Sequence, residues 1–178
     1  AGHLSIDADS VIITEKSRVA SDSFTDGNAG RISIEADSLE VSENARVYAG
    51  ALNAGAGGTI EIAAGRLGLT KRGAIVADVR DTGDGGTVHV KADEMTIDAG
   101  SVYGSTSGEG QGSRVRIESS ELRLLNGGRV ESAAFGPGQA GELEISADAA
   151  PYVLRNASFR VVFDGATRFH GDGGGARY

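Results

Sequence analysis

The chain of 178 residues has no cysteine, no tryptophan and only two prolines, and aromatic residues make up 5% of it. Because there are no disulfide bonds, packing and hydrogen bonding have to supply the stability. No run of about 18 apolar residues occurs in the sequence, which therefore predicts no membrane insertion. Acidic residues outnumber basic ones, and the net charge of −8 disfavours nucleic acid and anionic lipid as partners.

Glycine is abundant, with 28 residues, and it punctuates a repeat. The repeat is easiest to see in a triplet of two apolar residues, two positions apart, followed by a small residue. The triplets are Leu4-Ile6-Ala8, Ile32-Ile34-Ala36, Ile60-Ile62-Ala64, Val88-Val90-Ala92, Val115-Ile117-Ser119 and Leu143-Ile145-Ala147. Successive triplets are 28, 28, 28, 27 and 28 residues apart. Such a constant period indicates one structural unit stacked on copies of itself.

Alternation within each unit predicts β-strands with one buried face. The triplet is followed by a second apolar pair, such as Leu39/Val41, and by a third, shorter one, such as Val47/Ala49. Every unit runs in the same order, which excludes an antiparallel sandwich. The sequence therefore predicts an all-β fold, a right-handed parallel β-helix of about six coils with three short strands per coil. Glycine-rich segments such as residues 26–30 are expected to form tight turns between strands.

The repeat occupies residues 1–150, and the pattern breaks after Pro151. Residues 151–178 are expected to form an irregular terminal coil or cap, with a glycine-rich tail from Gly171. The 27-residue step maps to residues 98–101, where a linker between strands is one residue shorter than its counterpart at residues 70–74. The start at Ala1, directly before a repeat unit, suggests a piece of a longer solenoid.

The sequence predicts no enzyme, no cofactor and no metal site. Its histidines, at positions 3, 89 and 170, lack the spacing of metal ligands. The best carboxylate cluster is Asp78, Asp81 and Asp84 around Arg80, which is interpreted as a solvated turn; a calcium site there is the alternative.

Charged residues also return at the repeat period. Glu61, His89, Arg116 and Glu144 are predicted to share one outward column, and Lys91 and Glu118 another. Opposite charges on neighbouring coils add a few tenths of a kcal/mol each and favour the correct register.

A second outward column carries the candidate binding residues. Tyr48 and Tyr103 fall in it, and the flanking cations are Arg18, Arg46 and Arg129. Aromatic rings beside guanidinium groups are typical of a contact face for a sugar or a protein. In the alternative interpretation the tyrosines only cover the sheet. Phe24, Leu52 and Phe135 share one corner position, either on that face or packed under the corner as an auxiliary core.

The pattern Gly-x-Ala-Gly-x-Ile-x-Ile-x-Ala-x-x-Leu-x-Leu occurs as residues 27–41 and recurs with substitutions from Gly83, Gly110 and Gly138. It resembles the repeat of two-partner-secretion exoproteins of the filamentous-haemagglutinin type, over roughly residues 4–148. This resemblance implies a right-handed parallel β-helix that a dedicated outer-membrane transporter exports from a Gram-negative bacterium. The absence of cysteine suits such export, because a chain without disulfides can thread through a pore.

The resemblance favours a structural and adhesive shaft segment of a large secreted surface protein, with roles in adhesion, aggregation or biofilm formation. Its partner would be a glycan or protein on a host or neighbouring cell. A self-assembling extracellular filament joined end to end, and a polysaccharide-degrading β-helix enzyme, are the alternatives.

Overall fold

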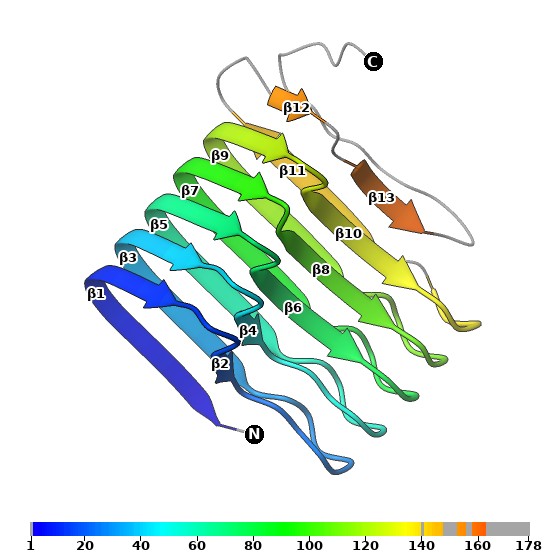
Figure 1. Ribbon diagram of the computed structural model, residues 1–178. Helices are drawn as coiled ribbons and strands as arrows, with labels where there is room; N and C mark the ends of the chain where they lie inside the picture. The colour runs from blue at the N-terminus through cyan, green and yellow to red at the C-terminus, as the bar shows by residue number, and fades with distance from the viewer. Residues whose placement is uncertain (1, 140, 148–152, 156–157, 163–178) are drawn as a thin grey trace.

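The computed structural model describes residues 2–139, 141–147, 153–155 and 158–162, and it is an all-β solenoid of stacked parallel strands (Figure 1). Five long strands lie side by side: β1 (His3–Ile13), β3 (Arg31–Val41), β5 (Thr59–Thr70), β7 (Thr87–Asp98) and β9 (Arg114–Leu125). Each is followed by a shorter strand: β2 (Arg18–Ala20), β4 (Arg46–Tyr48), β6 (Ala74–Val79), β8 (Ser101–Thr106) and β10 (Arg129–Ala134). These pairs make five turns, where the sequence predicted about six.

Three strands continue the stack beyond β10. β11 (Glu142–Ala147) and β12 (Val153–Arg155) both pair with β9, and β13 (Ser158–Val162) pairs with β10. The glycine-rich tail predicted from Gly171 lies outside the described residues. In the part of the chain that the structure describes, no helix could span a membrane.

The strand register confirms the repeat. Ile34 on β3 pairs with Ile6 on β1 and with Ile62 on β5, and Ile62 pairs in turn with Val90 on β7. All of these strand pairs are parallel, so residues one period apart lie on adjacent coils. Side chains from both sheets fill the interior, where Ile62 is 3% exposed and Val90 is fully buried.

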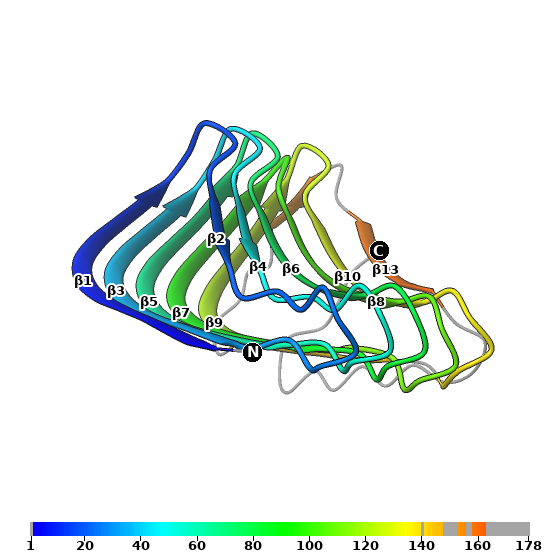
Figure 2. The same cartoon turned by 90° about the horizontal axis from the view of Figure 1, so that it is seen from below.

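Each coil has two strands where three were predicted, because the first two predicted strands are one continuous, bent strand (Figure 2). The bend falls near the middle, at the one position that the strand pairing skips: Asp9, Asp37, Gly65, Asp93 and Ser120. Apolar alternation is interrupted there, so the sequence pattern resembles two separate strands.

Tight turns join each long strand to its short strand. In four coils two consecutive residues have positive φ: Glu15-Lys16, Glu43-Asn44, Lys71-Arg72 and Asn126-Gly127. A hydrogen bond closes each turn, for example from Ser17 N to Thr14 O at 3.0 Å, as in a type I′ turn. The remaining coil has only Ala99 with positive φ. The 27-residue step therefore shortens this turn, as predicted, and leaves both strand registers intact.

The glycine-rich segments are not the tight turns that the sequence predicted. They are longer loops that leave the short strands and project from one edge of every coil (Figure 2). Their bases are narrow: Gly58 N donates to Ala49 O at 3.2 Å. A Cβ atom added to Gly58 would lie 2.4 Å from Gly30 O and 2.7 Å from Ala49 Cβ, so only glycine fits. Stacked on one another, these loops form a ridge beside the short-strand sheet.

Candidate functional site

A groove of about 480 Å³ lies between the outer face of the short-strand sheet and the loop ridge, across the first three coils. We call it the basic groove. It is lined by Lys16, Ser17, Arg18, Asp22, Phe24, Asn44, Arg46, Tyr48, Leu52 and Arg80. Four cationic side chains and one carboxylate line it, which makes this region positive in a chain whose net charge is −8.

Strand register places two of the groove's four cations on neighbouring coils. Arg18 on β2 pairs directly with Arg46 on β4, and the two residues lie on neighbouring coils. Arg80 comes from the third loop and holds the position that Phe24 and Leu52 hold in the first two loops. Backbone hydrogen bonds between neighbouring loops show this equivalence: Leu52 N donates to Ser23 O, and Arg80 N donates to Ala51 O. The wall and the floor of the groove therefore both follow the coil spacing.

Arg18 is held in place by two contacts. Its Nη2 atom donates to Asp22 Oδ2 at 2.8 Å, and its guanidinium carbon lies 4.4 Å from the centre of the Tyr48 ring. A guanidinium group over an aromatic face is favourable because the face carries partial negative charge. The other Asp22 oxygen, Oδ1, is buried and has no hydrogen-bond partner among the described residues.

Arg46 and Arg80 are exposed and form no ion pair within 4.0 Å with any residue that the structure describes. Both nonetheless act on the carboxyl of Asp78. Burial raises the pKa of Asp78, and a hydrogen bond from Ser105 and the charges of Arg80 and Arg46 oppose this rise. Because neither arginine forms an ion pair among the described residues, both guanidinium groups are available to an anionic ligand.

The structure brings together three of the five predicted binding residues, Arg18, Arg46 and Tyr48. The other two lie outside the groove. Tyr103 is on β8, packed beside a small apolar cluster, and Arg129 is on β10, 3.9 Å from Glu131.

The two tyrosines cover the short-strand sheet, as in the alternative interpretation, and do not offer freely exposed rings. Tyr48 is only 6% exposed, and it forms that outer apolar cluster with Ala74 and Val76. Its ring is covered by Arg18, and its hydroxyl lies over Gly50, where an added Cβ would be 2.4 Å away. Burial raises the pKa values of Tyr48 and Tyr103. Tyr48 thus supports the floor of the groove.

Phe24 and Phe135 do not form an auxiliary core. They are 68% and 69% exposed, because the loops carry them away from the body of each coil, while Leu52 is half-buried. Sequence reasoning did not assign Lys16, Asp22 or Arg80 to the site. The repeat contained a signal for Arg80, which follows Leu52 by one period.

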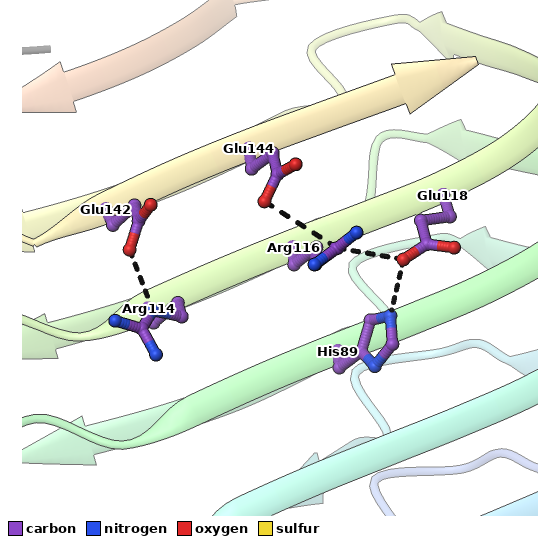
Figure 3. A network of polar contacts seen from close by, with 6 residues as sticks. All are labelled: His89, Arg114, Arg116, Glu118, Glu142 and Glu144. Carbon is purple, nitrogen blue, oxygen red and sulfur yellow. Dashed lines mark hydrogen bonds and ion pairs between the residues drawn. The ribbon is translucent and has the colours of Figure 1, made fainter. Parts of the chain in front are cut away.

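The predicted column of Glu61, His89, Arg116 and Glu144 is present in the strand register. Its contacts, however, do not all run straight along the column (Figure 3). His89 Nε2 lies 3.1 Å from Glu118 Oε1, which also contacts Arg116 Nε at 2.8 Å.

Arg116 reaches Glu144 at 3.6 Å, whereas Glu61 pairs with Arg31 at 2.6 Å. Lys91 pairs with Glu118 in register, but Glu118 is hydrogen-bonded to His89 and forms its ion pair with Arg116. The hydrogen bond from His89, followed by the charge of Arg116, holds the pKa of Glu118 below its usual value.

The three aspartates around Arg80 point to different partners. Asp78 accepts a hydrogen bond from Ser105 Oγ at 3.2 Å, Asp84 accepts one from Gln111 N at 2.9 Å, and Asp81 is exposed. Within the described part of the chain, no group of three His, Cys, Asp or Glu side chains could hold a metal ion. His170 lies outside that part.

The chain matches no protein-family model, no curated protein and no solved structure. The fold and the basic groove are therefore the basis for any functional conclusion.

Proposed function

We propose that this chain is a structural and adhesive shaft segment of a large secreted bacterial surface protein. The observation that carries the proposal is the unbroken parallel register from β1 to β11 in one sheet and from β2 to β10 in the other. Each coil repeats the cross-section of the one before, so such a rod can be lengthened by adding coils without redesigning the core.

A rod of this kind suits a protein that holds a binding surface away from a cell. Its stability comes from the ladder and the apolar interior, and it needs no disulfide, in keeping with a chain that lacks cysteine. The basic groove adds a surface that runs across several coils. The repeat pattern of residues 27–41 supports export by two-partner secretion, with a glycan or protein of another cell as the partner.

Adhesion can be tested with beads coated with the purified chain and passed over bacterial and epithelial cell layers under shear. We expect more beads to be retained than when they carry the same chain after heat denaturation. Equal retention of the two on every cell layer would contradict an adhesive role.

A further inference from the structure

We propose that the basic groove binds a carboxylated polysaccharide, with its acid groups held by the unpaired guanidinium groups of Arg46 and Arg80. This inference deepens the adhesive function proposed above by naming the class of ligand. It is carried by the charge of the groove, its two unpaired guanidinium groups and the exposed ring of Phe24 on its wall.

Charge selects an anion. The groove has Lys16, Arg18, Arg46 and Arg80 against the single carboxylate of Asp22. Arginine binds carboxylates through two parallel hydrogen bonds, and Arg46 and Arg80 have no competing ion pair among the described residues. The rest of the molecule is acidic, so a polyanion is attracted here and repelled elsewhere.

One further feature of the groove suits a sugar better than a simple anion or an acidic peptide. The ring of Phe24 is exposed on the wall and offers a flat apolar surface to the C–H face of a pyranose. A simple anion and an acidic side chain have no such face.

The test is calorimetric titration with three probes: a hexamer of galacturonic acid, the uncharged galactose hexamer and hexaglutamate. The double variant Arg46→Gln/Arg80→Gln removes the two unpaired guanidinium groups, both of which are exposed. The matched control Arg66→Gln/Arg123→Gln removes the same charge from exposed positions of the long-strand sheet. Circular dichroism checks that each variant is folded.

We expect the galacturonate hexamer to bind the unmodified chain and the control equally, and more weakly as salt concentration rises. The groove double variant should bind it at least about tenfold more weakly. The uncharged hexamer and hexaglutamate should bind more weakly than galacturonate. Equal binding of the uncharged hexamer, equal or tighter binding of hexaglutamate, or an unaffected double variant would overturn the proposal.

Phe24→Ser provides an independent test. Phe24 is 68% exposed on the groove wall, and Phe135, which is 69% exposed at the same loop position of a later coil, lies outside the groove. We expect Phe24→Ser to weaken galacturonate binding and Phe135→Ser to leave it unchanged. Unchanged binding by Phe24→Ser would show that the site takes a simple anion and would overturn the assignment to a sugar.

The two proposals can fail separately. Coated beads that adhere while galacturonate does not bind would contradict this inference and leave the adhesive function standing. Galacturonate binding by a chain whose coated beads do not adhere would contradict the adhesive function and leave this inference standing.

Discussion

Replacing Ile62 by alanine tests the stacked core most directly. Ile62 is 3% exposed and lies between Ile34 on one neighbouring coil and Val90 on the other. The change removes three carbon groups, at about 0.8 kcal/mol each. The backbone ladder holds the neighbouring coils apart and limits collapse into the cavity, which adds about 1–2 kcal/mol. We expect a total loss of about 3–4 kcal/mol in the free energy of unfolding.

Ile6→Ala is the matched control. Ile6 belongs to the same column but is half-buried on β1, where the described structure has a neighbouring coil on one side only, through Ile34. Its loss should therefore be about half as large, or roughly 1–2 kcal/mol. Urea unfolding followed by far-ultraviolet circular dichroism suits a chain without tryptophan. Equal losses for the two variants, or a loss below about 1 kcal/mol for Ile62→Ala, would refute vertical stacking as the source of stability.

Three further predictions concern charge and backbone conformation. The pKa of Glu118 is lower in the folded state than its ordinary value of 4.5, so the ionised carboxylate stabilises the fold above pH 4.5. This stabilisation disappears as pH falls through the lowered pKa. Glu118→Gln should therefore reduce the free energy of unfolding by under about 1 kcal/mol near neutral pH and leave it unchanged in acid. Thermal unfolding across this pH range measures the loss, with Glu35→Gln at an exposed position as the control. A loss that persists in acid, or an equal loss for Glu35→Gln, would contradict the prediction. The pKa of Asp78 is raised above its ordinary value of 3.8, so its ionised form destabilises the fold at neutral pH, and this effect disappears below pH 3.8. Asp78→Asn should therefore raise the urea midpoint at neutral pH. It should also tighten galacturonate binding, because it removes a negative charge that acts on Arg46 and Arg80. An unchanged or lower urea midpoint would show that Ser105, Arg80 and Arg46 fully compensate the buried charge of Asp78. Gly127→Ala should lower the free energy of unfolding by about 1–2 kcal/mol, because φ is +85° at this position. Steric crowding is not the cause, since no atom lies within 4 Å of an added Cβ. Gly68→Ala, equally uncrowded and without positive φ, should not destabilise, and equal urea midpoints for the two variants would exclude backbone strain as the cause.

Periodicity predicted the coil register because a parallel solenoid turns a constant spacing along the chain into direct contact between coils. Ile34 had to meet Ile62 once each coil repeated the path of the last, and the shortened turn at Ala99 was recognisable as a missing residue. The strand count was harder to predict. A bend at Asp37 breaks apolar alternation in the same way as a gap between two strands.

The site was only partly predictable. Arg18, Arg46 and Tyr48 share neighbouring columns, and the period is enough to group them. Burial of Tyr48 depends on how the Arg18 side chain folds over its ring and on the passage of Gly50 beneath its hydroxyl, neither of which has a periodic signal. Likewise, the partner of His89 is Glu118 because long side chains reach diagonally as easily as straight across a sheet.

By itself, the sequence determined which residues stack, which face of each strand forms the main core and where one coil is shortened. These properties follow from a period that every coil must obey to keep its backbone hydrogen bonds. Tertiary structure decided that the glycine-rich segments project as a ridge and that this ridge, facing the short-strand sheet, encloses the basic groove. The groove joins Lys16, Asp22 and Arg80 across three coils. Their meeting depends on the direction in which each loop leaves the body, which residue spacing does not encode.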